Sequence, residues 1–194
     1  MIAAVMLCTL AMPSAVRAQA SFDRRSDTVW TTCGSQYQRV VDASVERMRL
    51  VAEDRAGAKP APGKWSRKEI LGHLIDSAAN NQIRFVRAQL YDDMIFTGYD
   101  QNAWVSAQRY QERSWSELVH TWRAYNHQVA AVMRAAAVAE LERPRPRHNL
   151  HDIGFQLLPP DTPATLGWLM RDYVVHLQHH LDQILRIADG NATR

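Results

Sequence analysis

The chain has 194 residues, which is enough for one domain with a sizeable buried core. Its composition, 46% hydrophobic and 22% charged, is ordinary for a globular protein. The formal net charge of +3 is small and the basic residues are scattered along the chain, which argues against a nucleic-acid-binding protein.

The first 20 residues carry several features of a secretory signal peptide. They are apolar from Ile2 to Met12 and end in the Ala-Gln-Ala triplet 18–20, which matches a signal cleavage pattern. No basic residue precedes Arg17, although such signals normally begin with one. The apolar stretch is too short to cross a bilayer as a helix, so we predict no membrane span.

If residues 1–20 are cleaved, the protein is periplasmic or secreted, and otherwise it is cytoplasmic. We predict an N-terminal extension over residues 21–34 and a helical domain over residues 35–190. Cys8 and Cys33 have no CxxC partner, which argues against a cysteine metal site or a disulfide framework.

Four long helices are predicted, each bounded by helix-breaking residues. The first covers residues 35–55 and ends at Gly57, before the linker KPAPG at 59–63. Apolar side chains recur along it at helical spacing: Tyr37, Val41, Met48 and Val51.

The second helix has the clearest start signal in the chain. In the stretch WSRKEI, Ser66 is the predicted N-cap and Glu69 completes a capping box. We expect this helix to run to about Leu90. The segment FTGYDQNAW (96–104) follows as a loop, with a short helix that begins at Asp100.

Two further helices complete the pattern. The third starts at Ser114 in the motif SWSE and ends before the proline-rich run RPRPR (143–147). The fourth is expected to have Thr162 as its N-cap and Pro163 at its first position, and to end near Ala188. Because no segment alternates as a strand does, we predict an all-α fold, a four-helix bundle with long connections.

The fourth helix carries three histidines in the stretch YVVHLQHHLDQI, residues 173–184. A helical wheel places His176 and His180 on or beside the apolar face, one turn apart, and His179 on the outer face. Such a pair can present two imidazoles to one metal ion, whereas a catalytic zinc site usually takes three protein ligands. Two core histidines that are satisfied by hydrogen bonds are the alternative.

Periodicity does not identify a third ligand. His120 and His127 lie opposite the apolar face of the third helix, which indicates solvent exposure, and His148 and His151 lie in a connection.

His73 is the most interesting of the remaining histidines, because it begins a polar stripe on the second helix. This stripe continues with Ser77, Asn80 and Arg84, and Asp76 lies beside it. The wheel slightly favours a solvated face for the stripe over the wall of a cleft between helices.

Two motifs together resemble the DinB/YfiT-like superfamily. They are PGKWSRKEILGHLIDSAANNQIRF (62–85) and YVVHLQHHLDQI (173–184), and the loop GYDQNAW (98–104) is similar to that of YfiT-type members. The joint pattern, W-S-x-x-E-x-x-x-H followed by H-x-x-x-H-x-x-Q-I, is far more specific than either half. The resemblance covers residues 35–188.

This resemblance implies a four-helix bundle that binds a divalent metal through one histidine of the second helix and two of the last. Carried over to this sequence, the ligands are His73, His176 and His180, with His179 as their neighbour. Zinc is the expected ion, with Ni, Fe or Mn as alternatives, because imidazole suits several transition metals.

Four further residues are weaker candidates for a role near the metal. Asp76 and Asp172 each lie about one turn from a ligand, where they could accept hydrogen bonds from imidazoles. Asn80 and Arg84 could hold an anionic group of the substrate, since an arginine fork suits a carboxylate. Ordinary polar contacts within the bundle are the alternative for all four.

Members of the superfamily are described as metal-dependent hydrolases or as transferases of low-molecular-weight thiols. The resemblance therefore implies one of these activities on a small-molecule substrate, with a metal-activated water or thiolate as nucleophile. The alternative is a non-catalytic bundle that binds a metal or a partner in a stress response. The resemblance also implies a homodimer.

Overall fold

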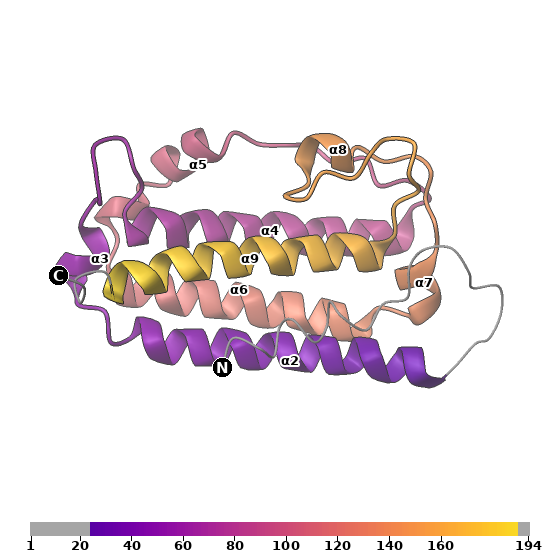
Figure 1. Cartoon of the computed structure of the whole chain (residues 1–194), viewed down its shortest axis with the longest axis horizontal. Coiled ribbons are helices and arrows are strands. Elements are labelled where there is room, and N and C mark those ends of the chain that lie inside the picture. Colours follow the sequence, from indigo (N-terminus) through magenta and orange to yellow (C-terminus); the bar gives the residue numbers. More distant parts are fainter. Residues whose placement is uncertain (1–23, 190–194) are drawn as a thin grey trace.

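A computed structural model describes residues 24–189, so the predicted signal peptide and Cys8 lie outside the described part of the chain. Four long helices run side by side (Figure 1): α2 (Arg24–Met48), α4 (Arg67–Leu90), α6 (Trp115–Ala135) and α9 (Leu166–Asp189). Short helices occupy the connections: α3 (Glu53–Gly57), α5 (Gln101–Ala107), η1 (Tyr110–Glu112), α7 (Val138–Glu142) and α8 (Leu150–Ile153). Residues 24–189 contain no strand, only two isolated β-bridges, and the all-α prediction is confirmed.

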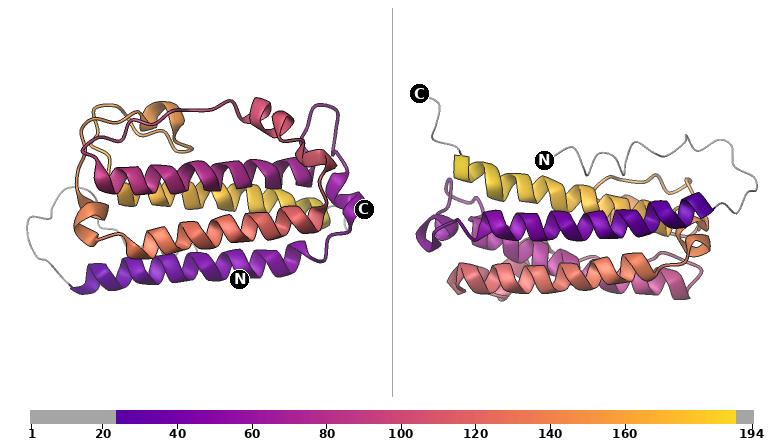
Figure 2. Two further views of the ribbon diagram at one scale, coloured as in Figure 1. Left: turned by 180° about the vertical axis from the view of Figure 1, so that it is seen from behind. Right: turned by 90° about the horizontal axis from the view of Figure 1, so that it is seen from below.

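The four long helices form one bundle around a shared core. α6 packs between α2 and α4, and α9 packs against α4 and α2 (Figures 1 and 2). The long connections that contain α5 and α8 run along the outer side of α4, which is therefore covered on more than one side (Figure 1). None of the described helices combines the length and the hydropathy that a membrane span requires.

Three predicted helix starts are confirmed by their capping hydrogen bonds. The Ser66 Oγ accepts from the Glu69 amide at 3.2 Å, and the Glu69 carboxylate accepts from the Ser66 amide at 2.8 Å. The Ser114 Oγ accepts from the Glu117 amide at 3.2 Å. Asp100 caps α5 by accepting from two backbone amides. These side chains satisfy amides that a helix leaves unpaired at its start.

A substitution in the capping box of α4 tests whether these side chains stabilise the helix starts. We expect Ser66→Ala to lower the free energy of unfolding by about 1–2 kcal/mol, because the Ala side chain cannot accept from the Glu69 amide. The Ser66 hydroxyl also donates to the Gln111 side chain at 2.6 Å, so the larger value is expected. Urea denaturation measures the effect, and the exposed Ser106→Ala is the control, with a change within about 0.5 kcal/mol. An equal effect of both substitutions would contradict the capping role.

The predicted first helix is wrong at both ends. α2 begins at Arg24, not near residue 35, so the predicted extension is largely helical. α2 also ends at Met48, where the Met48 carbonyl accepts from the Trp115 indole at 2.8 Å. Glu53, the first residue of α3, accepts from the Trp115 amide at 2.9 Å. Contacts with Trp115 thus turn the chain between α2 and α3, and a periodicity within one segment does not reveal them.

The predicted start of the fourth helix is also wrong. Ala164 pairs with Arg145 through two backbone hydrogen bonds of 2.7 and 2.9 Å, and this bridge keeps the chain extended past Thr162 and Pro163. α9 begins at Leu166, and the Thr165 hydroxyl accepts from the Trp168 amide at 3.1 Å. A pairing with a distant segment therefore moves the helix start beyond its local signal.

Antiparallel α4 and α9 are joined at one end by a buried arginine. Arg67, the first residue of α4, is 3% exposed and its Nε donates to the Ile184 carbonyl at 3.0 Å. A second guanidinium nitrogen donates to the Arg55 carbonyl. Arg67 therefore fixes the end of α4 next to the last turns of α9, one end of the pair that carries the histidines described next.

Candidate metal centre

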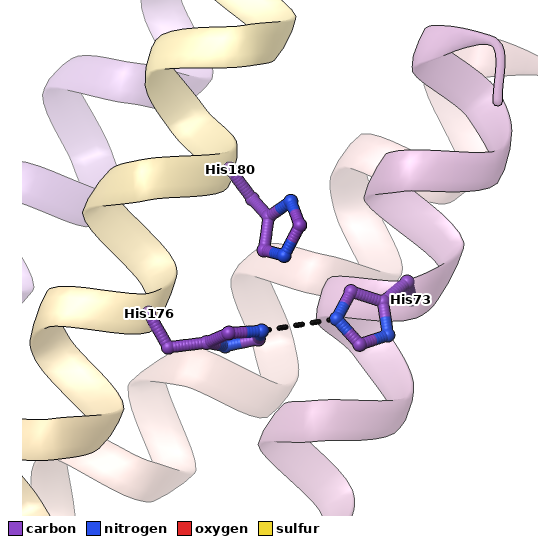
Figure 3. A group of neighbouring side chains, drawn as sticks. All are labelled: His73, His176 and His180. Atoms are coloured by element: carbon purple, nitrogen blue, oxygen red, sulfur yellow. Dashed lines mark hydrogen bonds between the residues drawn. The ribbon is translucent and has the colours of Figure 1, made fainter. Parts of the chain in front are cut away.

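Three histidines from α4 and α9 face one another between the two helices. Figure 3 shows His73 on α4 and His176 and His180 on α9, with their rings directed toward a common point. Their candidate ligand nitrogens all lie within 4.8 Å of one another. The Nε2 atoms of His73 and His176 are 3.0 Å apart. The bundle thus brings together the three residues that the resemblance implied as ligands.

One pair of these nitrogens has the spacing of two ligands on a single metal ion. Imidazole nitrogens bind zinc at about 2.0–2.1 Å, so two of them lie about 2.9–3.4 Å apart for ligand angles from square to tetrahedral. The observed 3.0 Å between His73 and His176 falls within this range. The three rings are mutually tilted, with centroids 4.6 to 5.0 Å apart, so none stacks flat on another.

Burial keeps these imidazoles in the form that a metal requires. Burial, together with the charges of neighbouring histidines, lowers the pKa of His73 to about 4 and that of His176 to about 2. Burial also lowers the pKa of His180. A protonated imidazole cannot bind a metal, so these groups offer free nitrogens at neutral pH.

The buried position of His73 contradicts the prediction from the helical wheel. The wheel slightly favoured a solvated face for the His73 stripe, but the His73 side chain is 1% exposed and Ser77, Asp76 and Arg84 are also buried. α9 covers this face at His176, and Tyr110 of η1 covers it at Asp76. Three residues of the stripe, His73, Ser77 and Arg84, therefore line a cleft between helices.

Two of the three rings also contact hydrogen-bonding side chains outside the cluster. The Nδ1 of His180 lies 2.8 Å from the Gln183 side-chain oxygen, which can only accept, so Nδ1 carries the proton and Nε2 is free for a metal. The Nδ1 of His176 lies 3.4 Å from the Ser77 hydroxyl. His179 is exposed, as the wheel predicted, and Gln183 contacts its Nε2 at 3.0 Å.

Asp76 lies near His73 but does not bond to it. One Asp76 oxygen accepts from the Tyr110 hydroxyl at 2.7 Å and from Gln108. The other oxygen and the His73 Nδ1 are both buried without a hydrogen-bond partner among the described residues. Burial raises the pKa of the Asp76 carboxyl. The predicted Asp76–His73 hydrogen bond is thus not formed here, although both groups retain the capacity for it.

Asp172 holds a loop instead of an imidazole. Its two oxygens accept from the backbone amides of Phe155 and Gln156 at 2.9 and 2.6 Å. This places the Phe155 ring 5.3 Å from that of His176 and 5.4 Å from that of His179. Phe155 was not predicted, because it lies in a connection without periodicity and reaches the site only through Asp172.

Of the two residues predicted to hold an anionic group, Asn80 makes a contact within its own helix and Arg84 lines a cavity. Asn80 donates to the Asp76 carbonyl of its own helix at 2.9 Å and does not line the cavity. Its neighbour Asn81 does, and donates to the Ser77 carbonyl at 2.9 Å. Arg84 lines the cavity as well.

Two cavities meet at the last of the three histidines. An inner cavity of about 400 Å³ extends along α4 from His73 to Arg84, and Tyr99 and Phe155 also line it. An outer cavity of about 650 Å³ lies toward the start of α4, and its walls include Trp65. The Trp65 ring lies 5.3 Å from that of His73. Only His179 and His180 line both cavities, so the cluster is reached from two directions.

The other histidines take no part in this cluster. His120 is exposed, as predicted, whereas His127 is half-buried and contacts the Asp42 carboxylate at 2.9 Å. His148 is buried and its Nε2 lies 2.8 Å from the Thr162 carbonyl. In the described part of the chain, the three clustered residues are the one group of three or more metal-binding side chains close enough to share an ion.

Comparisons with known proteins support this fold. The family model of the DinB superfamily matches residues 36–184. Among solved structures, YfiT from Bacillus subtilis matches with a TM-score of 0.65 and 19% sequence identity, over 89% of this chain and 91% of that chain. That protein is described as a probable metal-dependent hydrolase with an unusual four-helix bundle topology. The curated proteins contain no significant match to this sequence.

Proposed function

Because the chain belongs to the DinB superfamily, we propose that it binds one divalent metal ion through His73, His176 and His180 and acts as a metal-dependent hydrolase. The observation that carries this proposal is the convergence of three neutral imidazoles at the junction of two cavities. Zinc is the proposed ion, because a zinc enzyme usually combines three protein ligands with one open position. The description of YfiT as a probable metal-dependent hydrolase supports the same activity.

A divalent ion held by three neutral ligands keeps its full charge and can activate a water or a thiol as a nucleophile near neutral pH. The residues of the chain prepare the site for this. Gln183 holds the proton of His180 on Nδ1, away from the cluster. Phe155 and Trp65 place aromatic rings against His176 and His73.

A thiol transferase is the second candidate, and the two cavities favour it. A hydrolase needs a site for one organic substrate, whereas a transferase must bind a thiol and an electrophile together. The inner and outer cavities share only His179 and His180, so each could hold one of these substrates. A non-catalytic bundle that binds a metal or a partner remains the alternative prediction, and a homodimer remains a prediction from the resemblance.

Activity of the zinc-loaded protein tests the proposal. We expect turnover of a panel of 4-nitrophenyl esters that is lost on treatment with a chelator and restored by zinc. Consumption of both cysteine and an alkyl halide, with no ester hydrolysis, would favour the transferase. Ester turnover that survives complete metal removal would contradict a metal-dependent hydrolase. His120→Ala is the control and should retain activity, because His120 is exposed and lies outside both cavities and the histidine cluster.

A further inference from the structure

The inner cavity contains a buried arginine at the end away from the outer cavity. Arg84 lies on α4 two helical turns beyond Ser77, which contacts His176. Its side chain is 8% exposed, and it lines the same cavity of about 400 Å³ as the three histidines. Arginine stays charged even when burial lowers its pKa, as it does here. A buried positive charge therefore faces the space in which a substrate would lie.

Most of the hydrogen-bonding capacity of Arg84 is unused within the described residues. A guanidinium offers five N–H donors, and a single 3.3 Å bond joins Nη2 to the Thr97 carbonyl. No described carboxylate lies within ion-pair distance. Asp172 attracts the guanidinium, but its oxygens accept from the amides of Phe155 and Gln156.

The other fully buried arginines of the bundle are bonded differently. Arg145 is 1% exposed, donates to the Ala88, Glu140 and Arg143 carbonyls, and pairs with the Glu140 carboxylate at 2.8 Å. Arg67 donates to two carbonyls. These two side chains stabilise helix ends, whereas Arg84 has one long hydrogen bond, a cation–π contact with the Phe96 ring at 6.0 Å and a cavity in front of it. Burying such a charge is costly unless a ligand compensates it.

The chemistry of the lining favours a carboxylate as that ligand. The planar arginine fork matches the two oxygens of a carboxylate and binds it through two parallel hydrogen bonds. Asp172 and Asp152 also line the cavity, and their negative charges would repel a phosphate dianion more strongly than a monoanion.

We propose that Arg84 binds a carboxylate of the substrate in the inner cavity while the reacting group of the substrate lies at the three histidines. This inference rests on the proposed metal-dependent function and adds a substrate class to it: small molecules with a free carboxylate. Two helical turns separate Ser77 from Arg84, and a helical side chain leans toward the start of its helix. The carboxylate then lies roughly 5–10 Å from the reacting group.

Binding of matched hydroxamates to the zinc-loaded protein tests this without any measurement of turnover. The hydroxamate group binds zinc, and the far end of the molecule occupies the cavity. Adipic monohydroxamic acid ends in a carboxylate, and hexanohydroxamic acid has the same chain length with a methyl end. By calorimetric titration, we expect the carboxylate compound to bind at least about tenfold more tightly, as for a charged hydrogen-bonded pair.

Substitutions assign this preference to Arg84. Arg84→Gln should abolish the preference for the carboxylate and leave the affinity for hexanohydroxamic acid unchanged. Arg87→Gln, one turn along on the exposed side of α4, should keep the preference. If Arg84→Gln fails to fold by circular dichroism, Arg84→Lys replaces it, and the preference should fall at least about threefold because the fork is lost.

The outcomes separate this inference from the proposed function. Equal affinities in the wild-type protein, or a preference that survives in the folded Arg84 variant, would overturn the carboxylate site and leave the metal centre intact. A third hydroxamate of the same chain length, with a phosphonate at its far end, tests the substrate class, and tighter binding of it than of adipic monohydroxamic acid would overturn that class. Failure of every hydroxamate to bind the zinc-treated wild-type protein would overturn the metal centre and, with it, the role of Arg84.

Discussion

Replacing His73 by alanine should lower the zinc content of the purified protein from about one ion per chain to less than a tenth of that. His73 is the single proposed ligand on α4, so its loss would leave two proposed ligands on one helix, His176 and His180. Loss of a group that merely orients a ligand already weakens metal binding about 10–100-fold. Loss of the ligand itself should therefore weaken it by more than about 100-fold. Mass-spectrometric metal analysis of protein made without a histidine tag measures the effect.

The neighbouring histidines supply the controls for this experiment. His176→Ala should lose the metal as His73→Ala does, because the two side chains contribute equivalent nitrogens 3.0 Å apart. His179→Ala, on the exposed side of the same turn as His180, should retain it. Full metal content in both the His73 and the His176 variants would show that the ion binds outside the three-histidine cluster. Unfolding of all variants is checked by circular dichroism.

Gly72→Ala should destabilise the protein by about 3 kcal/mol, although alanine is the better helix former by about 1 kcal/mol. A Cβ at Gly72 would lie 2.1 and 2.2 Å from two ring atoms of Tyr110, far inside contact distance. Tyr110 is 1% exposed, and its hydroxyl donates to Asp76. The ring would have to leave its position, and its packing and the hydrogen bond to Asp76 would be lost together. Urea denaturation measures the change.

A double substitution identifies the cause of this effect. In the Tyr110→Ala background, the ring that clashes is absent, so adding Gly72→Ala should cost nothing further and should recover part of the helix propensity. Gly57→Ala is the matched control, because its nearest neighbour would be 3.5 Å away in ordinary contact. Additive effects of the two substitutions would mean that Tyr110 is not what excludes a side chain at residue 72.

Local signals in the sequence predicted the helix starts well where only neighbouring residues decide them. Ser66, Asp100 and Ser114 cap their helices because each bonds to amides two or three residues away. The signal at Thr162 failed because Ala164 pairs with Arg145, a partner that no local pattern reveals. The break after Met48 has the same kind of origin, since Trp115 contacts the chain there.

In the candidate site, too, the predictions succeeded where one helix alone decides the position of a residue and failed where distant segments decide it. The wheel placed His176 and His180 inward and His179 outward, because α9 has one apolar face that decides its orientation. On α4 the wheel slightly favoured a solvent-exposed position for His73, because a helical wheel contains no information on which other segments cover a polar face. The resemblance alone pointed to His73. Phe155 was missed for a related reason, since its position depends on the distant Asp172.

The separation of the histidines along the chain affects when the site can form. His73 and His176 are 103 residues apart, so their contact closes a long loop and has a high contact order. During synthesis, α9 is the last described helix to emerge, and a nascent chain without it offers a single imidazole of the three. The three-histidine cluster is therefore complete only after α9 has docked on α4, and under the proposed function metal uptake by a growing chain would report that late folding step.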